Sequence, residues 1–410
     1  MTMALAQRRS MWLGLGLLLV LAVGYTWATW RYFTEPLPGG NDFLTHYGAW
    51  EAYLKYGLNP YTDEAALHTQ MAIYGRPAKP GEDQNRMVYP FYSILLHGPF
   101  VYIRYSLARA IYMTLLQAAL LAGAVMTLDL VRWRLPGWLL ALVLAWSLLY
   151  YPAARGVILG QFALFGFFAL AGSLFLLKRG KDVAGGALLV LATFKPTLVF
   201  LVIPFLLLWA VVRRRWRFAA GFLITLAVLT LGSLLALPTW IGDWLFRIGR
   251  YSEYTVGQSP VWLLTNIAIP SLGQVGEWVV DGLLGAAMLW AWWRALRPEG
   301  DVEFHWALGV TLVISNLIVS RSATTNYVLM FVSTLWIFAA LDRLGRGGRI
   351  ALLVLMAISL VGHWWLHLAT VVGNQEQPIL FIPWPLVLGL LLCLGRGWLL
   401  QDARQAQVLP

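Results

Sequence analysis

The chain has 410 residues, of which 60% are hydrophobic and only 12% are charged, and its formal net charge is +11. A soluble domain of ordinary composition carries about 25% charged residues, so these values exclude an ordinary soluble enzyme. Apolar runs near the roughly 20 residues needed to cross a bilayer recur along the chain, which predicts an all-α polytopic membrane protein.

The positive charge is also compatible with nucleic-acid binding, but the basic residues lie in short clusters between apolar runs. The clearest clusters are the run from Arg213 to Arg217 and the group Arg343, Arg346 and Arg349. Cytoplasmic loops of membrane proteins carry such an excess of Lys and Arg. We therefore interpret the clusters as topology signals, and no nucleic-acid partner is predicted.

The first apolar run, Met11 to Trp30, follows Arg8 and Arg9 and resembles a signal peptide at its start. It is long, lacks a small-residue cleavage site and ends in aromatic residues. We therefore predict a retained first helix with a cytoplasmic N-terminus. The loop that follows, residues 31–87, is then external.

Taking the basic clusters as cytoplasmic gives about twelve crossings with both termini inside. After the first helix, the predicted spans are 105–128, 136–151, 161–177, 183–194, 196–212, 218–237, 276–293, 304–320, 325–341, 350–370 and 380–395. Segment 88–103, interrupted by Pro90 and Pro99, does not fit this parity. We interpret it as a re-entrant or interfacial helix, because broken backbone at membrane depth needs protein or water around it; thirteen spans are the alternative.

We predict one integral membrane domain over residues 1–410, with external loops at 31–87 and 238–276. Within the first loop, 43–56 and 63–74 have helical character. Apolar Phe43, Tyr47, Trp50, Leu54 and Leu58 recur at spacings of three and four. This pattern predicts an amphipathic helix lying on the bilayer surface.

The external segments collect one carboxylate, several cations and neutral hydrogen-bonding groups: Asp42, His46, Arg86, Arg155, Gln161, Lys195, Arg321 and Asn326. Arg and Lys match phosphate oxygens in charge and geometry, and a carboxylate can accept a proton from a hydroxyl nucleophile. The mixture favours a phosphate-bearing ligand. The simpler alternatives are that Asp42 caps a helix and that Lys195 reaches to the membrane surface.

Metal sites are not supported by the sequence. His46 follows Asp42 by four residues but has no further ligand at suitable spacing. His363 and His367 form an i, i+4 pair on an apolar span, and the absence of a third ligand favours packing over metal binding. Cys393 is the only cysteine, so no intramolecular disulfide forms. We predict no metal and no cofactor.

Several short motifs follow one another along the chain. Asn41-Asp42-Phe43 with Tyr47, followed by the run Gly57 to Tyr61, opens the first external loop. Further elements follow in order: Val88-Tyr89-Pro90-Phe91, Gly160-Gln161, Phe194-Lys195-Pro196 and Gly257-Gln258-Ser259-Pro260. Together these motifs resemble those of glycosyltransferase family 87, although Phe91 and Gly257 depart from that family's Tyr-Pro-Pro and Asn-Gln-Ser elements.

The resemblance implies a GT-C-type enzyme of the cell membrane, related to polyprenyl-phosphate-mannose-dependent mannosyltransferases. Such an enzyme transfers a sugar, mannose or another hexose or pentose, from a polyprenyl-phosphate donor to a lipid, glycan or protein hydroxyl. Transfer would occur on the extracytoplasmic side, with inversion and without metal. Asp42 would be the general base. Donor phosphate would bind Lys195, Arg321, Arg86 and Arg155, and the substrate-binding residues would be His46, Tyr89, Gln161, Gln258 and Asn326.

Two other functions stay open from the sequence. A lipid or sugar transporter or flippase also uses interrupted helices and intramembrane charges, although its site is expected at the membrane midplane. A ligase that moves a preassembled glycan from polyprenyl diphosphate would use the same cations. A non-catalytic scaffold is disfavoured, because it would not need external cations opposite a carboxylate.

Overall fold

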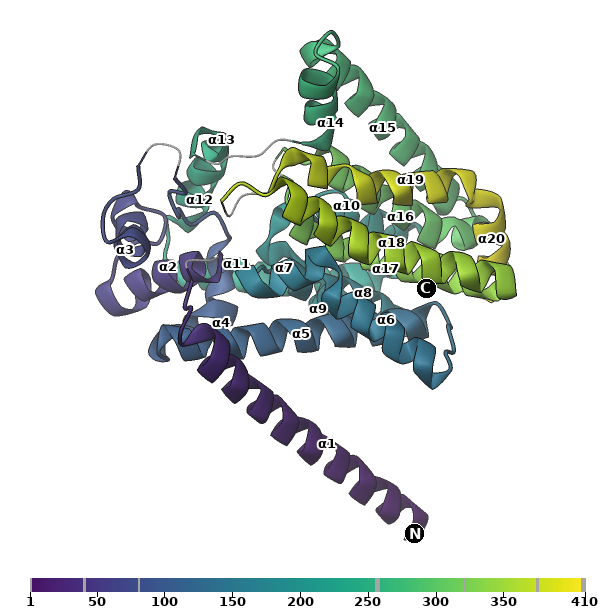
Figure 1. Ribbon diagram of the computed structural model, residues 1–410, viewed down its shortest axis with the longest axis horizontal. Coiled ribbons are helices and arrows are strands. Elements are labelled where there is room, and N and C mark those ends of the chain that lie inside the picture. The colour runs from purple at the N-terminus through teal and green to yellow at the C-terminus, as the bar shows by residue number, and fades with distance from the viewer. Residues whose placement is uncertain are drawn as a thin grey trace. The chain divides into compact units, whose positions relative to one another are not determined.

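The structure is a computed structural model that describes residues 2–39, 42–79, 82–254, 259–320, 322–373 and 376–406. Within these ranges the protein is built of helices and contains no strand (Figure 1), which confirms the predicted all-α class. The chain forms two compact units. Unit 1 comprises Met1–Met87, Ser93–Ala118 and Ile158–Gly160, and unit 2 comprises Val88–Tyr92, Ala119–Val157 and Gln161–Pro410.

Unit 1 holds the N-terminal helices and the loop that carries Asp42. Its elements are α1 (Thr2–Thr29), the π-helical turn η1 (Trp30–Thr34), α2 (Asp42–Tyr56), α3 (Asp63–Tyr74), α4 (Ile94–His97), the 3₁₀ turn η3 (Gly98–Tyr102) and the first half of α5 (Tyr105–Leu130).

Unit 2 holds most of the remaining helices. They are α6 (Gly137–Leu149), α7 (Tyr151–Leu159, whose last two residues belong to unit 1), α8 (Ala163–Lys178), α9 (Asp182–Leu189), η4 (Val190–Phe194), η5 (Pro196–Leu198), α10 (Val202–Val212), α11 (Trp216–Ala236), α12 (Trp240–Gly249), α13 (Tyr251–Tyr254), α14 (Pro260–Trp262), η6 (Leu263–Ala268), α15 (Gly273–Leu296), η7 (Gly300–Glu303), α16 (Phe304–Ile318), η8 (Thr324–Met330), α17 (Phe331–Arg343), α18 (Arg346–Thr370), η9 (Pro378–Phe381), α19 (Pro383–Leu394) and α20 (Arg396–Gln405).

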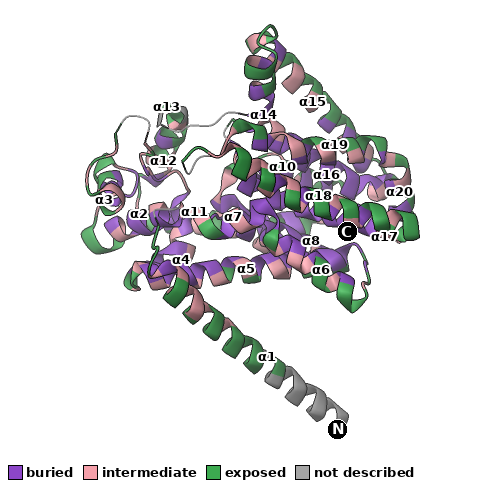
Figure 2. Ribbon diagram, in the orientation of Figure 1, coloured by how far each residue is buried: buried purple, intermediate pink, exposed green. Residues whose placement is uncertain are grey.

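Every predicted span coincides with at least one helix, but the helices differ in length. Among the described residues, 4 helices are long and apolar enough to cross a membrane, and the number rises to 6 if each of two bent pairs is one span. Figure 2 shows that α8 and α16 are almost entirely buried, whereas α15 and α18 carry long exposed faces. Exposed apolar helix faces indicate a membrane protein; the count of twelve crossings stays a prediction.

Helices α9 and α11 of unit 2 cross with their backbones in close approach. A Cβ atom added to Gly186 would collide with the Phe218 carbonyl oxygen, and one added to Gly221 would collide with that of Val183. Small residues permit such contacts between membrane helices, where packing rather than water exclusion drives association.

The basic loops of unit 2 meet one another at one end of that unit. Ion pairs connect Arg215 with Asp182 at 2.6 Å, Arg213 with Asp301 at 2.7 Å, Arg396 with Glu303 at 2.7 Å and Arg343 with Asp402 at 2.8 Å. Arg343 also donates to the carbonyl of Val131. These contacts join loops that the predicted alternation places on one side of the bilayer; that this side is cytoplasmic stays a prediction.

The interrupted segment at 88–103 contains three short helical pieces: the 3₁₀ turn η2 (Phe91–Ser93), α4 and η3. No helix of spanning length forms there, as Pro90 and Pro99 predict. Whether the segment re-enters a membrane stays a prediction.

Helices α2 and α3 confirm the two predicted helices of the first loop. The hydroxyl of Thr62 accepts from the Ala65 amide at the start of α3, and Gly75 ends that helix at a φ of 66°; both are common helix-end devices. The expected surface position of α2 is wrong for most of its apolar stripe. Phe43 and Trp50 are fully buried and Tyr47 is 7% exposed, because protein rather than lipid covers this face.

Candidate functional site

Asp42 is the first residue of α2, and a buried arginine fixes the chain that leads to it. The guanidinium of Arg109, which is 3% exposed, donates to the carbonyl oxygens of Leu37 at 2.8 Å, Pro38 at 2.7 Å and Ile158 at 2.9 Å. The Tyr105 hydroxyl donates to the Gly39 carbonyl at 3.1 Å. Because charge-assisted hydrogen bonds are strong, α5 holds the backbone on the N-terminal side of Asp42.

The residue after Asp42 is fixed by aromatic packing. The ring of Phe43 stacks on that of Tyr112 with centroids 4.4 Å apart and meets Phe100 edge to face at 5.6 Å. Gly160 lies against it: its φ is +74°, and a Cβ there would lie 2.5 Å from the Phe43 Cβ. The glycine of the Gly160-Gln161 motif therefore makes room for the start of α2. The negative charge of Asp42 interacts electrostatically with the side chains of Tyr105 and Tyr112.

His46 and Arg86 also belong to unit 1. His46 is 1% exposed and stacks on His97 at a centroid distance of 4.0 Å. His97 Nε2 lies 3.0 Å from the Tyr112 hydroxyl, so His46 is part of the packing that holds α2. Arg86 forms an ion pair with Asp63 at 3.3 Å.

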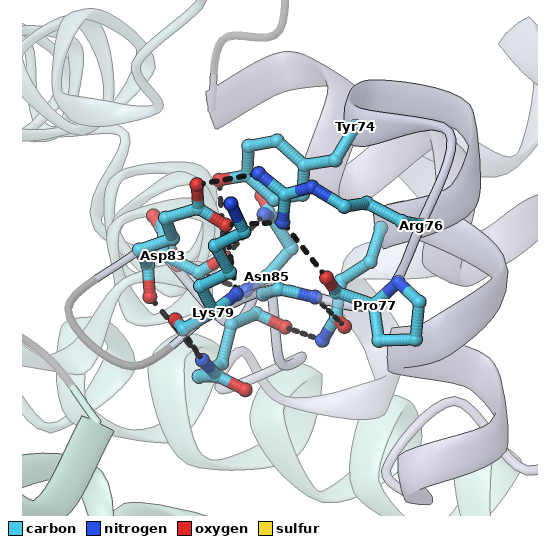
Figure 3. A network of polar contacts seen from close by, with 10 residues as sticks. Tyr74, Arg76, Pro77, Lys79, Asp83 and Asn85 are labelled. Atoms are coloured by element: carbon cyan, nitrogen blue, oxygen red, sulfur yellow. Dashed lines mark hydrogen bonds and ion pairs between the residues drawn. The ribbon is translucent and has the colours of Figure 1, made fainter.

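Polar contacts join residues 74–79 with residues 82–85 in the chain before Arg86, and we call these residues the polar loop (Figure 3). The guanidinium of Arg76 binds both carboxylate oxygens of Glu82 at 2.8 Å. This hydrogen bonding from Arg76 lowers the pKa of Glu82 from 4.5 to about 2. Asn85, at a φ of 49°, accepts at 2.8 Å from the hydroxyl of Thr45 on α2. This hydrogen bond connects α2, which carries Asp42, with Asn85, the residue before Arg86.

Three of the predicted residues meet in unit 2. The Lys195 ammonium donates to the Gln161 side-chain oxygen at 2.8 Å and to the Asn326 side-chain oxygen at 3.0 Å. Gln161 lies between α7 and α8, Lys195 between η4 and η5, and Asn326 in η8. We call these three residues the lysine cluster. The structure thus joins residues that are up to 165 positions apart, as Gln161 and Asn326 are.

Arg155 lies on α7 and pairs with a carboxylate that the sequence analysis missed. Its Nε is 3.0 Å from an oxygen of Glu376, and the two side chains are 17% and 10% exposed. Glu376 also accepts from the Tyr151 hydroxyl at 2.8 Å and from the Thr324 backbone amide at 3.3 Å, and the Thr324 hydroxyl donates to it as well. We call Arg155, Glu376, Tyr151 and Thr324 the arginine cluster. Thr324 precedes Asn326 by two residues in η8, so the two clusters share an element.

One feature of the sequence could have indicated Glu376. The loop between the predicted spans 350–370 and 380–395 is external in the same alternation that places Arg155 and Lys195 outside, and Glu376 is an acidic residue within it. No motif marks this residue, and its contact with Arg155 spans 221 positions.

The remaining candidates contribute less to the geometry. Tyr89 is half-buried, and the indole of Trp244 donates to the carbonyl of the preceding Val88 at 3.0 Å. Arg321 and Gln258 lie outside the described residues. The pair His363 and His367 hydrogen-bonds with tyrosines: their Nδ1 atoms lie 3.0 Å from the hydroxyls of Tyr150 and Tyr151, respectively. These contacts support the packing interpretation of the histidine pair.

The chemistry of these groups is that of a potential anion site in unit 2 and of a potential base in unit 1. Unit 2 supplies a lysine oriented by two neutral amides and an arginine oriented by a carboxylate. Unit 1 supplies a carboxylate whose flanking backbone and side chain are both fixed. Fixed cations stabilise negative charge that develops on a leaving group, and a fixed carboxylate can take a proton from a hydroxyl.

Comparison with known proteins identifies the family. The sequence model of glycosyltransferase family 87 matches residues 88–320, which is more than half of the chain. The matched range includes Tyr89, Arg155, Gln161 and Lys195 and begins after the loop of Asp42. Searches of the curated proteins and of the solved structures gave no match. The chain belongs to glycosyltransferase family 87 and is a membrane glycosyltransferase.

Proposed function

We propose that the protein transfers a sugar from a polyprenyl-phosphate donor to a hydroxyl acceptor on the extracytoplasmic side of the cell membrane. The reaction inverts the anomeric centre and needs no metal. The fold is of the GT-C type with about twelve spans, both termini are cytoplasmic, and the loops 31–87 and 238–276 are external. Mannose is the first sugar to test, with other hexoses and pentoses next.

The observation that carries this proposal is the lysine cluster. Gln161 and Asn326 are 8% and 4% exposed, and as neutral amides they orient the ammonium group of Lys195 without cancelling its charge. An oriented cation is suited to the phosphate of a lipid-linked sugar. The backbone on both sides of Lys195 is 3₁₀ rather than α-helical, and interrupted backbone in a membrane protein lines polar cavities.

In the proposed reaction the oxygen of the acceptor hydroxyl attacks the anomeric carbon, and the Asp42 carboxylate accepts the proton of that hydroxyl. The bond from that carbon to the phosphate oxygen breaks, and polyprenyl phosphate leaves. Lys195 and Arg155 stabilise the charge on the leaving phosphate, and Arg321 and Arg86 contribute to the same binding. Tyr89, Gln161, Gln258 and Asn326 bind sugar or phosphate. The burial of His46 favours a positioning role for that residue over direct contact with the sugar.

The proposal is tested with the purified full-length protein in lipid nanodiscs and a panel of polyprenyl-phosphate sugars. Mass spectrometry follows consumption of each donor. One sugar should be consumed, and Lys195→Ala should raise the KM for that donor about ten- to a hundredfold, the loss expected for hydrogen bonds to a charged group. The acceptor KM should change little.

Lys181→Ala is the matched control, because Lys181 is an exposed lysine in the loop after α8 and should leave both KM values unchanged. An unchanged donor KM in Lys195→Ala would remove Lys195 from donor binding. Turnover of nucleotide-sugar donors alone would contradict the proposed donor class.

A further inference from the structure

A polar cavity lies in unit 2, where the basic loops meet. It has a volume of about 450 Å³ and is lined by Leu128, Asp129, Arg132, Trp133, Arg134 and Lys178. Ligand pockets typically have volumes of about 300–1,000 Å³, so the space is sufficient for a small anion or a lipid head group.

The cavity is distinct from the lysine cluster. Gln161 lies two residues before α8 begins, whereas Lys178 is the last residue of that helix. Sixteen residues of α-helix span about 24 Å. A group bound in the cavity is therefore separated from the lysine cluster by the length of α8, and the cavity is not used by the transfer reaction proposed above.

The cavity carries an excess of positive charge. Asp129, which is the only acidic residue lining the cavity in the described part of the chain, lies 3.5 Å from both Lys178 and Arg179. Arg132 and Arg134 are exposed at the cavity, and within the described ranges Arg134 makes no ion pair. The neighbouring arginines Arg213, Arg215 and Arg343 differ, since each pairs with a carboxylate. Joining loops through ion pairs, which is the role of Arg213, Arg215 and Arg343, therefore does not explain the presence of Arg134.

The loop between α5 and α6, which carries Arg132 and Arg134, is fixed by contacts with α17. The indole of Trp133, which is 5% exposed, donates to Asp342 at 3.0 Å, and the guanidinium of Arg343 donates to the Val131 carbonyl. Both contacts anchor the loop between α5 and α6 to the end of α17. A wall that is ordered without a ligand loses little conformational entropy on binding.

The helices that flank the cavity expose apolar side chains. Val125 on α5 is 51% exposed, and Trp138 and Leu142 on α6 are 54% and 41% exposed. Such faces of membrane helices contact lipid tails, and Trp is enriched at the level of the head groups. Basic pockets between membrane helices are known to take anionic head groups.

We propose that this cavity binds a phosphate group through Arg132 and Arg134, and that its source is an anionic phospholipid whose tails lie along α5 and α6. The lipid is a structural or regulatory ligand and undergoes no reaction there.

The test uses the purified full-length protein in neutral detergent. Native mass spectrometry measures binding of phosphatidylglycerol, phosphatidylcholine and inorganic phosphate to the wild type, to Arg132→Gln/Arg134→Gln and to Arg214→Gln/Arg217→Gln. The variant Arg214→Gln/Arg217→Gln is a matched control, because Arg214 and Arg217 are also exposed arginines. Arg217 is the second residue of α11, and Arg214 lies in the turn before α11 and shares with Arg132 a left-handed backbone, with φ values of 56° and 52°.

Phosphatidylglycerol should bind the wild type and the control equally, and the cavity variant should bind it at least about tenfold more weakly, as expected for the loss of charge-assisted hydrogen bonds. Phosphatidylcholine should bind weakly throughout. If the double variant does not fold, Arg134→Gln alone is measured instead, because it leaves Arg132 and its left-handed backbone unchanged. It should also weaken the binding of phosphatidylglycerol.

Equal losses in the cavity variant and the control would show that general surface charge binds the lipid and would overturn the proposal. Equal binding of the two phospholipids would also overturn it. Inorganic phosphate that binds through Arg132 and Arg134 while phosphatidylglycerol does not would support the phosphate site and reject the lipid as its source.

Discussion

Asp42 in unit 1 lies in a segment fixed by aromatic packing as well as by charge-assisted hydrogen bonds, whereas Lys195 in unit 2 is oriented by hydrogen bonds to side chains. The chain around Asp42 is held by the Phe43 ring, which is fully buried, and by the three carbonyls that Arg109 binds. Lys195 is held by two side-chain hydrogen bonds at 2.8 and 3.0 Å. Burying a Phe side chain contributes about 1.5–3 kcal/mol, whereas one hydrogen bond to a charged group contributes about 1.5–3 kcal/mol only while both partners remain.

The difference predicts how each region responds to substitution. Near Asp42, a change of shape displaces the carboxylate even if no charge is altered. In the lysine and arginine clusters, a change of charge or of hydrogen-bonding capacity matters more than a change of volume. Substitutions that separate shape from charge therefore test the comparison directly.

The largest effect is expected for Asp42→Asn, which keeps the shape of the side chain and removes its basicity. The kcat for sugar transfer should fall about 10²- to 10⁴-fold, the usual contribution of a general base, while the melting temperature stays near that of the wild type. Steady-state kinetics with the donor identified by the panel provides the measurement.

Glu64→Gln is the control for Asp42→Asn, because Glu64 is an exposed acid in the first turn of α3. It should transfer sugar at the wild-type rate. If Asp42→Asn also keeps that rate, Asp42 is not the base and its position at the start of α2 reflects helix capping.

The next largest effect is expected in the arginine cluster. Removing one partner of a fully buried ion pair destabilises a protein by about 3–5 kcal/mol, because the other charge stays buried without compensation. The Arg155 and Glu376 side chains are 17% and 10% exposed, so Glu376→Gln should lower the free energy of unfolding by about 3 kcal/mol, the lower end of that range. The double variant Arg155→Gln/Glu376→Gln should lose less than the sum of the two single variants, as measured by denaturant unfolding in detergent. Additive losses would show that the two residues are not coupled.

The sequence predicted the helices better than their surroundings. The predicted range 63–74 coincides with α3, and the 3.6-residue pattern located α2 to within one residue. The same pattern could not show whether Phe43 and Trp50 contact lipid or other parts of the protein, because apolar side chains are favoured in both environments. For α2 the environment proved to be protein.

The candidate residues were predictable where topology placed them on one side. Alternation of charged loops put Gln161, Lys195 and Asn326 together, and the structure joins them. Glu376 also lies in a loop that the alternation makes external, but no motif marks it as the partner of Arg155 across 221 positions. The role of Gly160 was also hidden, since a close approach to Phe43 is a property of the fold.

A smaller effect is expected for Gly160→Ala, which tests the shape dependence around Asp42. Alanine at a φ of +74° costs about 1–2 kcal/mol in backbone energy, and the collision with the Phe43 Cβ adds about 1–3 kcal/mol. The kcat should fall because Phe43 follows Asp42, while the donor KM stays near the wild-type value. Kinetics and denaturant unfolding measure the two effects.

Gly57→Ala separates the two costs of the Gly160 substitution. Gly57 has a similar φ of +69°, but a Cβ there meets nothing within 4 Å. It should show only the backbone cost, with a smaller loss of stability than Gly160→Ala. Equal losses in the two variants would mean that the contact with Phe43 is relieved without displacing α2.

The smallest effect is expected from Glu82, on the polar loop of unit 1. Its pKa in the folded protein is about 2, below the usual 4.5, so the carboxylate stabilises the loop at pH values above 4.5. This stabilisation is lost as the pH falls from about 4.5 towards 2, because protonation weakens the pair with Arg76. Hydrogen exchange of the segment 74–87 should be slower in the wild type than in Glu82→Gln at pH 6, and the difference should disappear as the pH approaches 2. If the difference in exchange rate between the wild type and Glu82→Gln persists unchanged to pH 2, the charge of Glu82 does not stabilise this loop.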